Sequence, residues 1–155
     1  MPKAPINGIE LYYESHGDDS APAIIFAHGR GGNHMSWWQQ VAAFFGEFRC
    51  ITFDHRGWGA SIAEHGTPLR ENFIDDLTAL LDYLKIDKTF LVAQSMGGFS
   101  CLGFALAHRE RTLGLVLGDT TGGVATEGTL AALKNTKPAP EGPARSLSAS
   151  FIQDN

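Results

Sequence analysis

Four short, continuous apolar runs constrain the fold of this chain more strongly than any other feature. Each has four or five residues between polar or turn-forming positions; the runs are AIIFA (23–27), CITF (50–53), FLVA (90–93) and LGLVL (113–117). Apolar runs of this length, without polar alternation, are typical of strands buried on both faces of a parallel sheet. The sequence therefore predicts a sheet whose strands are mainly parallel.

The segments between these runs have the period of helices. In residues 70–84, five apolar side chains fall on one helical face: Phe73, Leu77, Leu80, Leu81 and Leu84. Residues 36–45 and 96–108 show helical patterns too, and IELYYE (9–14) follows the turn pair Asn7-Gly8, which predicts an edge hairpin. Strands that alternate with helices predict an α/β fold with a doubly wound sheet.

Composition narrows the class of protein. A chain of 155 residues, 43% apolar and 19% charged, fits one globular domain. The formal net charge is -5 and Lys and Arg do not cluster, so neither nucleic acid nor an anionic membrane is an expected partner. No apolar run approaches the ~20 residues of a membrane span, and the N-terminus lacks the apolar core of a signal peptide. Cys50 and Cys101 are predicted to be buried free thiols, and the expected location is the cytoplasm.

A serine follows the third apolar run, in AQSMG (93–97). This segment has the form of the nucleophile elbow G-x-S-x-G, with Ala93 in place of the first glycine. The pattern predicts a strained backbone at Ser95 and a helix that begins at Met96, with its positive end toward the serine. The alternative is an ordinary serine that caps the helix.

Two further motifs follow the first and second runs. HGRGG (28–32) can direct backbone N–H groups at an oxyanion, and the N–H groups of Arg30 and Met96 are the candidate donors. The alternative is a glycine-rich connector; the glycine spacing does not fit a dinucleotide fingerprint. DHRGWGAS (54–61) has two glycines that allow a tight turn, and we expect Asp54 and Arg56 to hold that turn in a structural role.

In this order, the motifs HGRGG, DHRGWGAS and AQSMGG resemble the α/β-hydrolase family over about residues 6–121. The resemblance is nearest to esterases, enol-lactonases and carbon–carbon hydrolases. It implies a catalytic Ser95, an oxyanion hole formed at Arg30 and Met96, and no cofactor or metal. It also implies that residues 1–121 are the N-terminal part of a hydrolase core, and that residues 122–155 are the start of a cap or a partly disordered tail.

The partners of the serine are harder to find. The family's triad runs serine, acid, histidine along the chain, but no histidine follows His108. His108 itself lies about 12 residues into the helix after the serine, or ~18 Å along its axis. Asp119, after the fourth run, is the candidate acid, with a turn cap as the alternative. We therefore expect the N-terminal part of a longer hydrolase, whose sheet stops before the family's last strands.

These observations predict a serine hydrolase that acts on an ester, a lactone or an activated C–C bond through an acyl-enzyme, impaired because the catalytic histidine is absent. The alternative is a non-catalytic fragment that binds a small ligand, with Trp37, Trp38 and Trp58 as exposed aromatic side chains. The expected partners are a small acyl substrate and a second protein surface. Because residues 113–117 lack charge and proline, we expect an open sheet edge that pairs in a homodimer or with a complementary C-terminal fragment.

Overall fold

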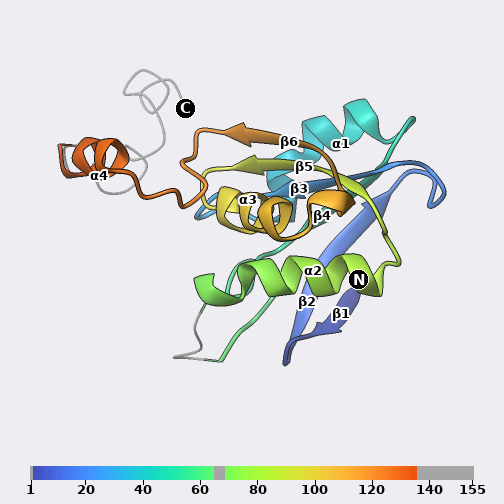
Figure 1. Ribbon diagram of the computed structural model, residues 1–155. Helices are drawn as coiled ribbons and strands as arrows, with labels where there is room; N and C mark the ends of the chain where they lie inside the picture. The colour runs from blue at the N-terminus through green and yellow to red at the C-terminus, as the bar shows by residue number, and fades with distance from the viewer. Residues whose placement is uncertain (1, 65–68, 136–155) are drawn as a thin grey trace, which may run out of the picture. The chain divides into compact units, whose positions relative to one another are not determined.

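The computed structural model describes residues 2–64 and 69–135 (Figure 1). The chain divides into two compact units, residues 1–123 and residues 124–155. The second unit contributes one described helix, α4 (Glu127–Lys134). Thr126 and Thr129 exchange backbone-to-hydroxyl hydrogen bonds at its start, which caps the helix N-terminus.

The first unit is built on a six-stranded sheet with the order β1-β2-β4-β3-β5-β6. Its strands are β1 (Lys3–Ile6), β2 (Ile9–His16), β3 (Ala23–Ala27), β4 (Arg49–Phe53), β5 (Thr89–Gln94) and β6 (Thr112–Gly118). The pairings β1–β2 and β2–β4 are antiparallel, whereas β4, β3, β5 and β6 pair in parallel. The predicted mainly parallel sheet is confirmed, and the four apolar runs are four of its strands.

An antiparallel hairpin begins the sheet, as the Asn7-Gly8 pair predicted. Asn7 and Gly8 both have positive φ, 47° and 81°. Two consecutive positive φ angles are typical of a type I′ turn, whose twist matches that of the paired strands.

Helices cover both faces of the sheet (Figure 1). A short 3-10 turn (His34–Trp37) leads into α1 (Trp38–Phe44) on one face. The other face is covered by α2 (Phe73–Tyr83), which follows a 3-10 turn (Arg70–Asn72), and by α3 (Gly97–Ala107), which precedes another (Arg109–Arg111). Successive residues of β3 point to opposite faces of the sheet and belong to different hydrophobic clusters. Ile25 belongs to the cluster that contains Leu77, Leu80 and Phe104. Ile24 and Phe26 belong to the cluster that Trp37 and Val41 pack against.

The run 113–117 carried two predictions, burial on both faces and an open sheet edge. Among the described strands β6 pairs only with β5 and lies at an edge of the sheet, so the edge position is confirmed and the burial on both faces is wrong. Leu113 is 47% exposed and Val116 is 59% exposed. A strand with one neighbour leaves one row of backbone groups and part of its side chains without cover, so an apolar run alone does not establish burial.

Candidate active site

Ser95 lies on the turn between β5 and α3 and has the backbone geometry expected of an elbow. Its φ is 49°, a left-handed value that is uncommon for any residue other than glycine. The Ser95 N–H donates to the Gly118 carbonyl at 3.0 Å, and the Ser95 carbonyl accepts from the Gly98 N–H at 3.0 Å. The prediction of a strained serine is confirmed. Met96 is the N-cap of α3, and the helix itself begins at Gly97.

Gly97, two residues after the serine, is small for a packing reason. A Cβ atom at Gly97 would overlap the Ala27 carbonyl at the end of β3. The first turn of α3 therefore approaches the backbone of the neighbouring strand as closely as only glycine permits. Ala93, which replaces the first glycine of the elbow pattern, is buried in β5 without strain in φ.

The HGRGG loop (28–32) meets the elbow because β3 and β5 are adjacent and parallel. A Cβ atom on Gly29 would overlap the Gln94 side chain and would lie 3.3 Å from the Cβ of Ser95. Within the described residues, neither the Arg30 N–H nor the Met96 N–H has an acceptor. The convergence of these two groups on one point near the Ser95 hydroxyl remains a prediction.

Two buried histidines lie behind this loop. His28 is the first residue after β3 and His55 is the second residue after β4. Both are buried. Their rings meet edge to face, with centroids 4.6 Å apart. Burial lowers the pKa of both imidazoles, that of His55 to well below 6.5, where the neighbouring His28 adds to the effect. Both side chains are therefore neutral near pH 7.

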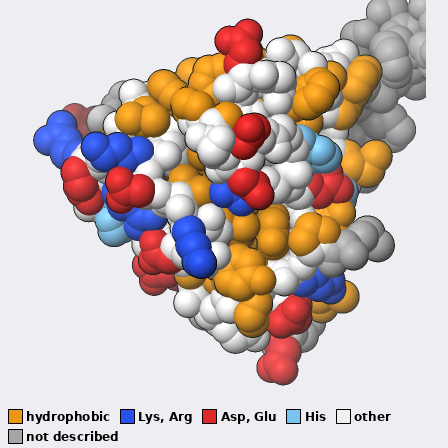
Figure 2. Space-filling view, turned by 90° about the vertical axis from the view of Figure 1, so that its right-hand side faces the viewer, with side chains coloured by type: hydrophobic (Ala, Val, Ile, Leu, Met, Phe, Trp, Pro, Cys, Tyr) orange, Lys and Arg blue, Asp and Glu red, His pale blue; other side chains and the backbone are white. Residues whose placement is uncertain are grey.

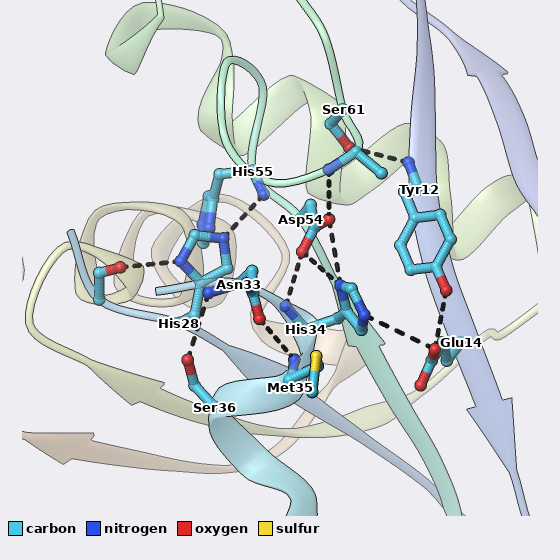
Figure 3. A network of polar contacts seen from close by, with 12 residues as sticks. Tyr12, Glu14, His28, Asn33, His34, Met35, Ser36, Asp54, His55 and Ser61 are labelled. Carbon is cyan, nitrogen blue, oxygen red and sulfur yellow. Dashed lines mark hydrogen bonds and ion pairs between the residues drawn. The ribbon is translucent and has the colours of Figure 1, made fainter. Parts of the chain in front are cut away.

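The DHRGWGAS turn (54–61) is held by Asp54, which is fully buried (Figure 3). Its carboxylate accepts from the backbone N–H of Ala60 at 2.7 Å and from that of His34 at 2.6 Å, and also from the His34 ring at 2.9 Å. Gly59 has φ 50°, and a Cβ there would overlap the Asp54 carboxylate. The predicted structural role of Asp54 is confirmed.

Arg56 holds the same turn through a partner that sequence reasoning missed. It forms two hydrogen bonds to Asp76 in α2, at 2.8 and 2.6 Å, and both side chains are almost completely buried. Asp76 also accepts from the Asn7 side-chain amide at 2.9 Å. The available signal was an aspartate next to Leu77 on the apolar face of the predicted helix, since a buried carboxylate requires a partner.

A second polar group extends from His34 to strand β2. Tyr12 donates its hydroxyl proton to Glu14 at 2.7 Å, and His34 lies 3.7 Å from the same carboxylate (Figure 3). This hydrogen bond, with burial, raises the pKa of Tyr12 to about 12. For Glu14, burial opposes ionisation, but hydrogen bonds from Tyr12 and His16 outweigh it and lower its pKa. Glu14 is therefore a carboxylate at neutral pH.

The position of Asp119 agrees with its prediction as a residue that follows the fourth apolar run. Asp119 follows β6, beside the end of β5, and is exposed with φ 50°. Its role as the triad acid remains a prediction.

Two of the three tryptophans predicted to be exposed are half-buried, so the prediction is wrong for them. Trp37 packs on Phe26, and Trp58 packs edge to face on Phe73.

Trp38, in contrast, is 69% exposed. It borders a cavity of about 360 Å³ between α1 and strands β2 and β4. Val41, Ala42 and Phe45 form its apolar wall, and Glu14 lies at its polar side. The cavity does not include Ser95.

The end of the sheet away from Ser95 carries charges of both signs. Figure 2 views the side from which the parallel strands start, where acidic and basic side chains lie among hydrophobic ones. Exposed Asp19 pairs with Arg49 at 3.0 Å, and exposed Asp82 pairs with Arg111 at 2.8 Å. Positive and negative groups thus neutralise one another locally there.

The described residues contain no group of three or more potential metal ligands. None of their helices has the length and apolar character needed to cross a bilayer. Both cysteines are buried free thiols, as predicted. The part of the predicted cap or tail from residue 136 onward lies outside the described residues.

The fold and the turn at Ser95 define a class: an α/β protein with a serine on a strained strand-to-helix turn. A family model described as the alpha/beta hydrolase fold matches residues 22–138, and the chain belongs to this family. The 3-oxoadipate enol-lactonase 1 of Acinetobacter baylyi is 32% identical over 120 residues, which cover 77% of this chain and 45% of the lactonase.

Solved structures agree. The enol-lactonase from Burkholderia xenovorans LB400 is 34% identical with a TM-score of 0.69, over 74% of this chain and 45% of that one. A thermophilic esterase from Thermogutta terrifontis is 30% identical with a TM-score of 0.70, over 85% of this chain and 48% of that one. The chain thus spans less than half the length of each of these relatives.

Proposed function

We propose that this chain carries the nucleophile and the oxyanion-binding groups of a serine hydrolase that acts on an ester, a lactone or an activated C–C bond. The observation that carries the proposal is Ser95 at φ 49°, at the carboxyl end of β5, with the HGRGG loop against its side chain. Relatives named as an enol-lactonase and an esterase favour acyl transfer to water over other chemistry.

In the proposed reaction the Ser95 oxygen attacks the substrate carbonyl carbon, and its proton passes to a base. The Arg30 and Met96 N–H groups stabilise the negative oxygen that forms, in a geometry that the positive end of α3 assists. Collapse expels the leaving group, which takes up a proton. Water then attacks the acyl-enzyme, which releases the acid and regenerates the Ser95 hydroxyl.

The described residues offer no histidine that is placed to act as the general base for Ser95. His28 and His55 are buried and hydrogen-bonded elsewhere, and His34 binds Asp54. His108 is the C-cap of α3, at the end of the helix away from the serine. We therefore expect impaired turnover, with a residual acceleration of about 10³-fold over water from the oxyanion hole and binding alone. Asp119 would orient a histidine supplied from outside these residues.

A fluorophosphonate probe tests the nucleophile directly. We expect a covalent adduct on Ser95, identified by peptide mass spectrometry, and its loss in Ser95→Ala. The matched control is Ser20→Ala, at an exposed loop serine remote in the fold from the elbow. An unlabelled Ser95 at probe concentrations that label other serines overturns the proposal. Rapid turnover of p-nitrophenyl acetate that depends on Ser95 would contradict the impaired base.

The second candidate function is non-catalytic binding of a small apolar ligand. The cavity of about 360 Å³ beside Trp38 favours it, because the wall formed by α1 is mostly apolar. A neutral apolar dye that quenches tryptophan fluorescence, with no quenching in Val41→Asp and no adduct on Ser95, would support binding in place of catalysis.

We also propose binding partners and a location for this chain. A small acyl substrate is the expected partner, and the open edge of β6 is the proposed contact with a second copy or with a complementary fragment. Two buried free thiols suit a reducing cytoplasm.

A further inference from the structure

The two buried histidines are linked by hydrogen bonds, in which the His55 backbone N–H meets the His28 ring, and the direction of each bond can be assigned. The His28 Nδ1 atom lies 2.8 Å from the Gly29 carbonyl, which only accepts, so Nδ1 carries the proton. The His55 backbone N–H donates to His28 Nε2 at 3.0 Å, so Nε2 carries none. His28 is therefore the neutral Nδ1–H tautomer.

His55 has the opposite tautomer. The Ser100 hydroxyl donates its one proton to the Gly97 carbonyl at 2.9 Å. The same oxygen lies 3.0 Å from His55 Nε2, so it accepts a proton from that nitrogen. A second observation agrees: His55 Nδ1 is buried without a partner among the described residues, between Phe53 and Phe73. A bare nitrogen is better tolerated there than an N–H donor left without an acceptor.

Together these bonds join the HGRGG loop to the elbow. The connection runs from the Gly29 carbonyl through the His28 ring to the His55 backbone N–H, and then from the His55 ring through the Ser100 hydroxyl to the Gly97 carbonyl, in the first turn of α3. The Gly29 carbonyl and the Arg30 N–H belong to one planar trans peptide, in which the two groups point in opposite directions. Fixing the carbonyl therefore fixes the direction of the N–H.

We infer that His28 and His55 are positioning residues that orient the Arg30 N–H relative to Ser95. The catalytic meaning of this orientation rests on the proposed oxyanion role of Arg30; the orientation itself does not. The Gly29 carbonyl also accepts from the Gly32 N–H at 3.0 Å, so His28 supplies one of two bonds that hold this peptide. Within the described part of the chain, only the bond from His28 links this peptide to the turn after β4 and to α3.

Imidazole ¹⁵N resonances of the 155-residue chain at pH 7.5 test the assignment. We expect His28 to be protonated at Nδ1 and His55 at Nε2, in two-bond ¹H–¹⁵N correlation spectra. The reversed tautomer at either residue, or a protonated ring at both nitrogens, overturns the inference. This measurement does not depend on whether Ser95 reacts.

Two substitutions then separate the two bonds of His28. In His28→Asn the amide nitrogen replaces Nδ1 and keeps the donor to Gly29, whereas in His28→Gln the amide replaces Nε2 and that donor is lost. We expect the Arg30 amide order parameter to fall below ~0.6 in His28→Gln, from the ~0.85 of rigid backbone, and to fall less in His28→Asn. His108→Gln, at the far end of α3, is the matched control and should leave it unchanged.

Ser95 labelling gives the functional readout. We expect fluorophosphonate labelling of Ser95 to slow by about 10²-fold in His28→Gln, as for loss of one oxyanion donor. In His28→Asn the labelling rate should fall by about tenfold or less. If wild-type Ser95 is not labelled, the proposed function fails while the tautomers and the Arg30 order parameter still decide this inference. Equal Arg30 order parameters in wild type and His28→Gln overturn it.

Discussion

Acid should destabilise this fold through its two buried neutral histidines. Burial lowers the folded-state pKa of His28 and His55, whereas in the unfolded chain both return to about 6.5. Below pH 6.5 the unfolded state therefore binds more protons than the folded state. The stability that the neutral rings contribute is fully present above that pH, and it is lost as the pH falls toward the folded-state pKa values.

The size of the effect follows from linkage. With an unfolded pKa of 6.5, one histidine that stays neutral in the folded protein costs about 1.2 kcal/mol of unfolding free energy between pH 6 and pH 5. Two such residues cost up to about 2.4 kcal/mol, and His28→Gln should reduce the loss by up to about 1.2 kcal/mol. Asp54 and His34 also face His28 with opposing effects on its pKa, and both remain in the variant.

Urea denaturation followed by tryptophan fluorescence, at pH 7.5, 6.0 and 5.0, measures these differences. Glu14 does not interfere, because its pKa is lowered from 4.5 and it stays ionised over this range. Parallel pH profiles for wild type and His28→Gln would refute the argument, since they would mean that His28 takes up a proton without unfolding the protein.

Three further predictions follow from packing and charge. Gly97→Ala places a methyl group against the Ala27 carbonyl, and we expect a loss of about 1–3 kcal/mol or more in urea denaturation. Asp76→Ala leaves the Arg56 guanidinium buried without its charge partner, and the same measurement should show a loss of about 3–5 kcal/mol. Val116→Lys places a charge on the exposed edge strand β6, and sedimentation velocity should show less self-association than in the wild type.

Each of these has a matched control. Gly46→Ala enters open space and should cost little. Asp82→Ala breaks an exposed ion pair with Arg111, worth less than about 1 kcal/mol. Leu106→Lys changes an equally exposed apolar residue on α3 and should leave association unchanged. Equal losses for Asp76→Ala and Asp82→Ala would refute the buried-pair argument, and a wild type that stays monomeric at high concentration would refute the edge contact.

Local pattern predicted most of the fold. The runs at 23–27 and 90–93 lie within β3 and β5, and the apolar face of 70–84 is the buried face of α2. These predictions succeeded because apolar side chains at strand or helix spacing pack on covered faces of the sheet; the similar run in β6 lies at an edge and is largely exposed. The backbone of Ser95 could be predicted for a related reason: a serine with small residues two positions to either side, after a buried strand, has the pattern of the strained strand-to-helix turn.

The imidazole chain could not be predicted from pattern. His28 and His55 are 27 residues apart, and His55 and Ser100 are 45 residues apart. Their contact depends on the lateral order of β4, β3 and β5, which periodicity does not specify. The motifs HGRGG and DHRGWGAS placed both histidines in loops, but both side chains are buried.

Asp76 shows what a sequence can still reveal about such contacts. An aspartate beside Leu77, on a helix face that otherwise carries Phe73 and Leu80, contradicts the local pattern, because an unpaired carboxylate among apolar side chains is costly to bury. The contradiction itself predicts that a cation or several donors lie opposite. The pattern does not say that the cation is Arg56, since only the fold brings that turn to α2. A buried charge that conflicts with its helix face therefore locates one half of a long-range contact before the structure supplies the other.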